Sequence, residues 1–285
     1  MIAGRVGIVG TGRVARALAL GLGVRSSATP MMWGRTPAHL PEGGGVLAVR
    51  SLEEVAEQCD VIAIAVSDDA LLQVVDAFAG AQFRPGALAF HVSGGSGTAI
   101  LEPLRIRGVR TAAVHPVMTF TGNADIEVQR MAGACFAITA PDGDTMRQAR
   151  TIVKALGGIA VEIAEDRRTL YHAALSHAAN HLVTLLAGAT RALHAAGIEH
   201  PESLVAPLVR ASLENSIAKG FDALSGPLLR GDVNMVRGHL AALANDCPEV
   251  LPAYRAMALS TIDELERRNK AATLSTLRAV VDDVQ

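Results

Sequence analysis

The first half of the chain alternates short apolar runs with segments in which apolar residues recur every three or four positions. The short runs have the length and β-branched content of strands, whereas the periodic segments between them are typical of amphipathic helices. The run at 61–66 is apolar at every position, as expected for a parallel strand covered on both faces. The expected strands are 6–9, 31–34, 46–49, 61–66, 87–92, 110–114, 135–139 and 159–163.

Beyond residue 164 the alternation stops and the pattern is helical almost throughout. We therefore expect an α/β fold, with a Rossmann-type doubly wound, mostly parallel sheet followed by an all-α C-terminal domain. The expected domains are an α/β domain at 1–164 and a helical domain at 165–285. Besides the helix that follows Gly12, the expected helices are 51–58, 70–79, 144–156, 165–196, 203–218, 233–243, 248–268 and 273–283.

Several polar residues stand where helices are expected to begin. Ser51 with Glu54 three residues later has the spacing of a capping box. Asp69, alone or together with Asp68, is expected to cap the helix at 70–79. The alternative is that the loop of Ser67, Asp68 and Asp69 lies near the nicotinamide half of a cofactor. Asp232 is suited to cap the helix at 233–243.

A glycine turn follows the first strand, within V-G-I-V-G-T-G-R-V-A-R-A-L at positions 6–18. Gly10 permits a tight turn, Gly12 lets the backbone approach a pyrophosphate, and Ala15 allows the following helix to pack closely on the strand. The free N–H groups and the positive dipole end of that helix then face the phosphates. This motif is short, and it indicates a dinucleotide-binding site because it lies between an expected strand and an expected helix.

The residues after the second strand favour NADP over NAD. A carboxylate at this point binds the 2′-hydroxyl of NAD, whereas arginine accommodates the 2′-phosphate of NADP. No Asp or Glu occurs between the glycine turn and Glu42, and Arg35 and Thr36 follow the strand. The alternative is that Arg35 is a solvated loop residue. The expected cofactor contacts are Gly10, Thr11, Gly12, Arg13, Val14, Arg35, Thr36, Val66, Ser67 and Ser93.

The composition indicates which classes of partner and which cellular compartment to expect. A formal charge of -2 provides no basic excess for nucleic acid or a membrane surface. The segment 169–190 lacks charged residues but carries several histidines and other polar groups, which disfavours a membrane span. Cys59, Cys135 and Cys247 are widely spaced and odd in number, so we expect reduced thiols in a cytoplasmic protein without export signal or metal site.

The candidate catalytic row lies on the long helix. His172, Ser176 and Asn180 are spaced i, i+4, i+8 and share one face of it. His172 is the candidate acid, because an unperturbed imidazole has a pKa of about 6.5, and Asn180 is suited to hold a substrate. The alternative is a set of hydrogen bonds between helices. His177 and His181 are turned away from this row and are expected at a packing surface or interface.

Four further residues are candidates for substrate contacts. Ser93 and Gly94 follow the strand at 87–92, at the carboxyl end where open α/β sheets bind ligands. His115 ends the strand at 110–114, although a histidine before proline is alternatively a loop-locking residue. Arg230 can pair with a substrate carboxylate, or is an exposed loop arginine.

Together these blocks resemble a family of bacterial proteins that join a Rossmann-like domain to a helical domain of unassigned function. The blocks are G-T-G-R-V-A-R-A-L, A-V-S-D-D-A-L, H-V-S-G-G, H-P-V-M-T-F, Y-H-A-A-L-S-H-A-A-N-H and L-S-G-P-L-L-R-G-D with V-R-G-H-L. They are similar to the 6-phosphogluconate dehydrogenase, ketopantoate reductase and pyrroline-5-carboxylate reductase superfamily. The resemblance implies an NADP-type cofactor, a site in the inter-domain cleft and a homodimer paired through helical domains.

One departure from these relatives bears on catalysis. In β-hydroxyacid dehydrogenases and ketopantoate reductases the long helix carries K-x-x-x-N, and here Ser176 occupies the lysine position before Asn180. Two functions therefore stay open. The first is an NADPH-dependent reductase of a small keto acid or imine, with His172 as acid and Asn180, Ser93 and His115 orienting the substrate. The second is a non-catalytic NADP(H)-binding sensor or assembly protein.

Overall fold

The computed structural model describes residues 2, 4–36, 45–78, 80–268 and 274–283. The chain divides into two units, Met1–Leu175 and Ser176–Gln285. The division falls inside helix α7 (Arg168–Ala195), so this one helix contributes residues to both units. The boundary expected after Ala164 stays a prediction.

The first unit is built on an eight-stranded sheet with the order β3-β2-β1-β4-β5-β6-β7-β8. All neighbouring strands pair in parallel except β6 and β7, which are antiparallel. The expected fold class and each expected strand are confirmed. The strands are β1 (Val6–Val9), β2 (Met31–Trp33), β3 (Leu47–Ala48), β4 (Val61–Ile64), β5 (Leu88–His91), β6 (Arg110–Pro116), β7 (Cys135–Thr139) and β8 (Ile159–Glu162).

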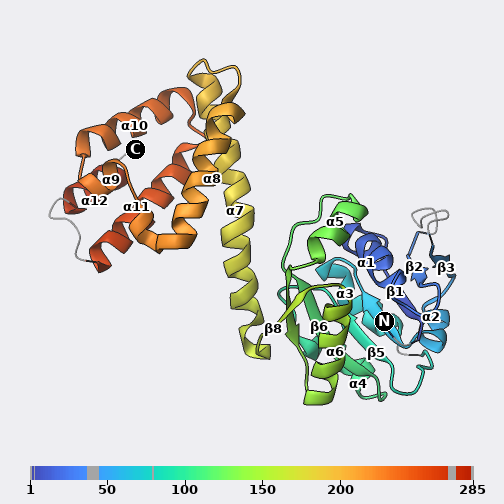
Figure 1. The fold of residues 1–285 in the computed structure, drawn as a ribbon. Helices are drawn as coiled ribbons and strands as arrows, with labels where there is room; N and C mark the ends of the chain where they lie inside the picture. The colour runs from blue at the N-terminus through green and yellow to red at the C-terminus, as the bar shows by residue number, and fades with distance from the viewer. Residues whose placement is uncertain (1, 3, 37–44, 79, 269–273, 284–285) are drawn as a thin grey trace. The chain divides into compact units, whose positions relative to one another are not determined.

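Helices cover both faces of this sheet (Figure 1). Side chains of α1 (Arg13–Gly23), α5 (Ala124–Met131) and α6 (Gly143–Ala155) pack into one core. Those of α2 (Leu52–Gln58), α3 (Asp68–Ala77) and α4 (Glu102–Arg105) pack into the other. Alternate residues of β1, β2, β4 and β5 therefore enter opposite cores.

Strand β4 shows why the apolar run at 61–66 is uninterrupted. Val61 and Ala63 point into the core under α1, whereas Ile62 and Ile64 point into the core under α2 and α3. Fully burying a valine or isoleucine contributes about 1.5–3 kcal/mol, so a polar residue at any of these positions would be costly. Both faces of the strand thus select apolar residues.

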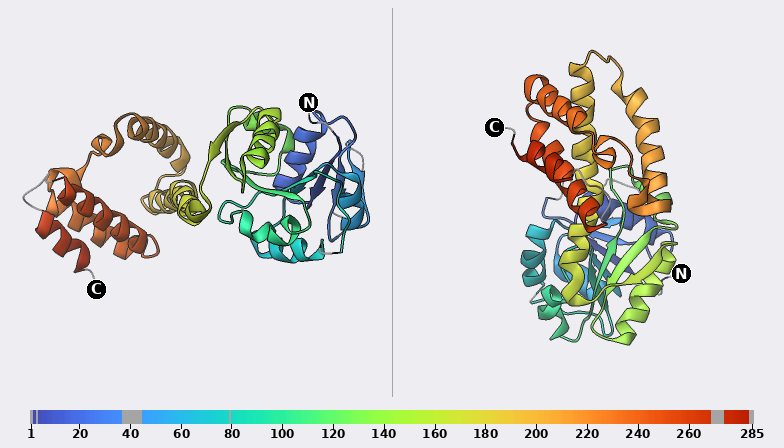
Figure 2. Two further views of the ribbon diagram at one scale, coloured as in Figure 1. Left: turned by 90° about the horizontal axis from the view of Figure 1, so that it is seen from below. Right: turned by 90° about the vertical axis from the view of Figure 1, so that its left-hand side faces the viewer.

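The second unit consists of helices. After α7 in the sequence, its α-helices are α8 (Pro201–Lys219), α9 (Pro227–Arg230), α10 (Val233–Asp246), α11 (Leu251–Arg267) and α12 (Leu274–Asp282). Helices α10, α11 and α12 contact one another, and Figure 2 shows them in orange to red. Their core includes Val236, Leu240, Ile262, Leu265 and Leu277, all of which are buried.

The expected helix caps are confirmed in two cases and wrong in a third. The hydroxyl of Ser51 accepts the N–H of Glu54 at 3.3 Å, although Glu54 Oε1 accepts from Arg50 N rather than from Ser51. Asp232 Oδ1 accepts the N–H of Met235 at 3.1 Å. Helix α3 begins at Asp68, with Ser67 as its N-cap residue. The capping role expected of Asp69 is therefore wrong, because both carboxylates lie in the first turn and favour the helix dipole there.

The sequence pattern did not predict several short helical segments. These are α4, α5 and α9, together with the 3-10 segments Thr98–Leu101 and Gly220–Ala223. Segments of four to eight residues are too short for a helical period to stand out. In the described parts of the chain, no helix combines the length and the apolar character needed to span a bilayer.

Candidate active site

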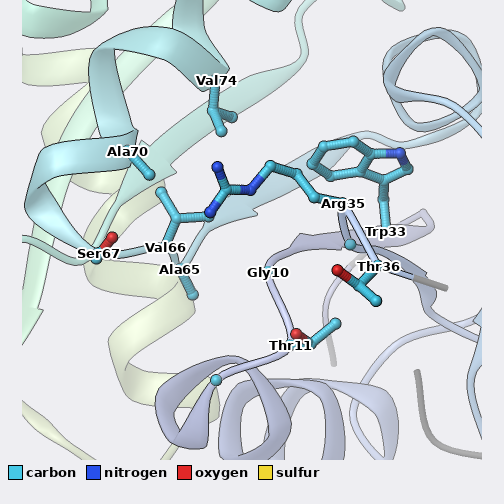
Figure 3. Close-up of a pocket in the computed structure, with 12 residues that line it drawn as sticks. Gly10, Thr11, Trp33, Arg35, Thr36, Ala65, Val66, Ser67, Ala70 and Val74 are labelled. Carbon is cyan, nitrogen blue, oxygen red and sulfur yellow. The ribbon is translucent and has the colours of Figure 1, made fainter. Parts of the chain in front are cut away.

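A pocket of about 300 Å³ opens at the carboxyl ends of three strands (Figure 3). The loops after β1, β2 and β4 form it, and β1 and β4 are the strands from which the sheet extends in opposite directions. Such a switch point is where doubly wound sheets bind ligands. The lining residues are Gly10, Thr11, Gly12, Trp33, Gly34, Arg35, Thr36, Ala65, Val66, Ser67, Ala70 and Val74.

The two glycines of the turn have different structural roles. Gly10 has a φ of 124°, and a Cβ atom there would lie 2.2 Å from the carbonyl oxygen of Ala65. Only glycine fits this position, because both the backbone conformation and the neighbouring strand exclude a side chain. A Cβ atom at Gly12 would meet nothing within 4 Å, so the fold itself leaves this position free to carry alanine.

The N-terminus of α1 borders the same pocket. Its N-cap residue is Gly12, which has no side chain to bind the first-turn amides, and no acidic residue lies in that turn. Helix N-termini of this kind bind anions through backbone N–H groups and the helix dipole. Arg16 Nε donates to the carbonyl of Thr11 at 3.1 Å, and Arg13 Nη1 donates to the carbonyl of Phe120 at 3.2 Å. Arg16 thus binds the glycine turn, and Arg13 binds the loop after β6.

The selectivity residues expected after β2 lie at the rim of this pocket. Arg35 and Thr36 are exposed, and Figure 3 shows the Arg35 side chain extending over the pocket toward Val66. Within residues 33–36 the pocket wall carries no carboxylate. Glu42, the first acidic residue after the strand, lies outside the described residues.

A second group of polar residues gathers at the same edge of the sheet, beyond β4. The parallel strands β5 and β6 end beside it, and Ser93 and Gly94 follow β5 while His115 lies near the end of β6. Adjacent strands lie about 5 Å apart, so these residues stand one and two strands from the pocket wall at Ala65. The first turns of α7 supply Arg168, Tyr171 and His172.

Arg168 holds the loop of residues 93–97 in place. Its guanidinium donates to the carbonyls of Ser96, Ser93 and Ala137 at 2.8, 3.0 and 3.2 Å, and the residue is only 1% exposed. A buried guanidinium is costly unless its donors are satisfied, and three carbonyls meet that requirement. Glu165 binds the end of the same loop by accepting the N–H groups of Thr98 and Ala99.

His91 holds the loop from the other side. Its Nε2 atom lies 2.8 Å from the carbonyl of Gly97, and its Nδ1 atom accepts the N–H of Ser93 at 3.1 Å. A carbonyl can only accept, so the proton of this ring lies on Nε2. Burial lowers the pKa of His91 to about 4, which keeps the ring neutral at physiological pH. His91 is therefore a structural residue of the loop.

Two histidines meet at Gly94. A Cβ atom there would lie 2.5 Å from His172 Cδ2 and 3.0 Å from His115 Nε2, so the absence of a side chain lets both rings approach. The ring centroids of His115 and His172 are 5.8 Å apart in an edge-to-face arrangement. Tyr171 completes the group, with its hydroxyl 2.8 Å from His115 Nδ1. The structure thus brings together four sequence candidates, Ser93, Gly94, His115 and His172.

The remaining candidates belong to the second unit. Asn180 Nδ2 lies 3.5 Å from Ser176 Oγ, and Asn180 is exposed. Arg230 ends α9 and is exposed as well. His177 and His181 contact each other, with their Nδ1 atoms 3.0 Å apart. The substrate roles expected of Ser176, Asn180 and Arg230 stay predictions.

Comparison with protein-family models matches residues 3–116 to a Rossmann-like domain and residues 134–261 to a domain of unknown function, DUF2520. The chain joins a Rossmann-like domain to a DUF2520 domain. This confirms the resemblance that the sequence blocks carry. No curated protein sequence matches the chain.

Solved structures of similar fold include reductases. A proposed NADP oxidoreductase from Bacteroides fragilis is 19% identical with a TM-score of 0.73, over 91% of this chain and 98% of that chain. An imine reductase from Myxococcus stipitatus in complex with NADP+ is 16% identical with a TM-score of 0.66, over 96% and 99%. NADP-bound pyrroline carboxylate reductase from Plasmodium falciparum is 17% identical with a TM-score of 0.62, over 98% of both chains. Likeness at these identities establishes the fold.

Four residues of the polar group were missed in the sequence: His91, Glu165, Arg168 and Tyr171. Three of them bind backbone groups of residues 93–99, and such contacts leave no pattern in the sequence. A signal existed for Arg168, because it is the last charged residue before the uncharged segment 169–190 of the DUF2520 domain. A charge at the edge of such a segment needs a partner.

Proposed function

We propose that this chain is an NADPH-dependent oxidoreductase that reduces a small keto acid or an imine. The observation that carries the proposal is the pocket at the β1–β4 switch point, with its glycine turn, uncapped helix N-terminus and rim without a carboxylate. The NADP-bound and NADPH-bound structures of similar fold support the choice of cofactor.

The pocket residues fit this cofactor. The face of Gly12 that is free of neighbouring atoms suits a pyrophosphate, and the α1 amides suit its charge. Arg35 and Thr36 would bind the 2′-phosphate, and Val66 and Ser67 would lie along the cofactor toward β5. NADPH, when bound, supplies a hydride.

The chain supplies the proton and the orientation of the substrate. His172 would protonate the oxygen or nitrogen atom that becomes an alcohol or amine. Ser93, Gly94 and His115 surround the same place and would hold the reacting group. Asn180, Ser176 and Arg230 are proposed as further substrate contacts, on the sequence grounds given above.

We also propose that the protein is a homodimer paired through its helical part. On α8 only Pro201 is buried, although the helix carries several large apolar residues. Leu208 and Ile217 are 67% and 78% exposed, and Val183 of α7 is 69% exposed. An apolar surface of this extent is typical of an interface, and a second copy of the chain would cover it.

Replacement of Gly12 tests the cofactor site. Gly12→Ala is expected to weaken NADPH binding about tenfold or more, because a methyl group would occupy the face that a pyrophosphate approaches, yet to change the free energy of unfolding by less than about 1 kcal/mol. Trp33 lines the pocket and is the one tryptophan, so its fluorescence reports binding. The matched control is Gly80→Ala, at an exposed glycine with equal space. Unchanged affinity in Gly12→Ala would contradict the pyrophosphate site.

Replacement of His172 tests the reaction. The purified protein is expected to oxidise NADPH with at least one member of a panel of 2-keto acids and cyclic imines. His172→Ala should lower that turnover about a hundredfold or more while NADPH binding is retained. His177→Ala, at an exposed position on the same helix, is the control. Full turnover in His172→Ala removes His172 from the mechanism, and tight NADPH binding without turnover across the panel favours the sensor.

Replacement of an exposed leucine tests the dimer. Leu208→Glu is expected to convert a dimer to a monomer, because a carboxylate would be buried without a partner at the interface. Light scattering during size-exclusion chromatography measures the mass of each variant. Val24→Glu, at an apolar residue of the first unit that is 69% exposed, should leave the mass unchanged. A monomeric wild-type protein at micromolar concentration would overturn the proposal.

A further inference from the structure

We propose that Tyr171 is a positioning residue, whose hydroxyl fixes His115 as the Nε2–H tautomer so that His115 donates a hydrogen bond to a substrate atom bound beside the two histidine rings. The inference deepens the proposed function and rests on it. It assigns the two histidines different tasks, with His115 as a fixed donor and His172 as the acid.

The first step is the bond between the two rings. Tyr171 Oη lies 2.8 Å from His115 Nδ1, and the rings meet edge to face with centroids 5.8 Å apart. Burial raises the pKa of Tyr171 to about 12, so the phenol keeps its proton. The proton of a half-buried phenol needs an acceptor, and Nδ1 of His115 lies at hydrogen-bond distance.

The second step is the charge of His115. Burial, followed by the positive charge of Arg168 and the neighbouring His172, lowers the pKa of His115 to about 4. Asp68 raises the pKa of His115 and His91 lowers it, both more weakly than the groups above. A neutral imidazole carries one N–H, so a ring that accepts at Nδ1 donates at Nε2. His91 has the same tautomer for the same reason, with its Nδ1 atom accepting from Ser93.

The third step is the direction of that donor. His115 Nε2 lies 3.0 Å from the position that a Cβ atom on Gly94 would occupy, and His172 Nε2 lies 3.0 Å from the same position. Both Nε2 atoms therefore lie beside Gly94, on the side where a side chain would project. The oxygen of a carbonyl or the nitrogen of an imine bound beside the two rings would present its lone pairs to these nitrogens. A neutral donor holds such a group without itself giving up a proton.

The tautomer is measurable without any substrate. In protein carrying 15N-labelled histidine at pH 7, His115 is expected to show an unprotonated Nδ1 and a protonated Nε2, with the signal assigned from its loss in His115→Gln. Tyr171→Phe keeps the ring and removes the hydroxyl, and His115 should then populate both tautomers. A protonated Nδ1 in the wild type, or an unchanged tautomer in Tyr171→Phe, overturns the proposal.

A matched control exists in the second unit. Tyr254 Oη lies 2.9 Å from His239 Nδ1, with the rings edge to face and centroids 6.0 Å apart. Tyr254→Phe should alter the His239 signal alone and leave turnover unchanged. Tyr171→Phe should lower kcat about tenfold with the KM for NADPH unchanged, the effect of one lost hydrogen bond. A wild type without turnover overturns the proposed reductase, whereas the nitrogen spectra decide the tautomer in either case.

Discussion

The three hydrogen bonds of Arg168 determine where the candidate catalytic residues lie. The guanidinium joins the loop after β5 to strand β7, and it stands at the first position of α7. Tyr171 and His172 follow within about one turn of that helix, so their positions against His115 and Gly94 depend on where Arg168 is held. A lysine could not replace it, because three carbonyls in different directions match a guanidinium and not an ammonium group.

The loop of residues 93–97 is therefore shaped by the protein itself. His91 binds both of its ends, Arg168 binds two of its carbonyls, and the Ser93 hydroxyl accepts the N–H of Ser96 at 3.2 Å. A loop so restrained keeps Gly94 facing the two histidines before any ligand arrives. Preorganisation of this kind lowers the entropy that binding would otherwise cost.

Much of the fold was predictable from the sequence, because its signals are local. A strand such as β4 is apolar at every position, and Gly10 sits between a strand and a helix, so both could be assigned from neighbouring residues alone. The antiparallel direction of β7 could not be predicted, because a run of apolar residues does not show in which direction the strand runs within the sheet. The start of α3 was misplaced, since Ser67, Asp68 and Asp69 are all residues that favour a helix N-terminus.

The candidate site was predictable only in part. His172, His115 and Gly94 were found as separate candidates, from their strand ends and helix face. The residues that hold these candidates together were not predicted. Arg168 and His91 form hydrogen bonds with backbone groups, and such contacts leave no pattern in the sequence. Tyr171 adjoins His172 in the sequence, but its role depends on a histidine 56 residues away.

Hydrogen exchange of the Ser93–Ala99 amides in Arg168→Met and in the matched variant Arg167→Met tests the central claim most directly. Arg167 is adjacent in sequence, and its side chain is 69% exposed. The loop amides should exchange about tenfold faster or more in Arg168→Met, because the loss of even one net hydrogen bond has that effect, and at the wild-type rate in Arg167→Met. Equal exchange in the two variants would show that Arg168 does not hold the loop.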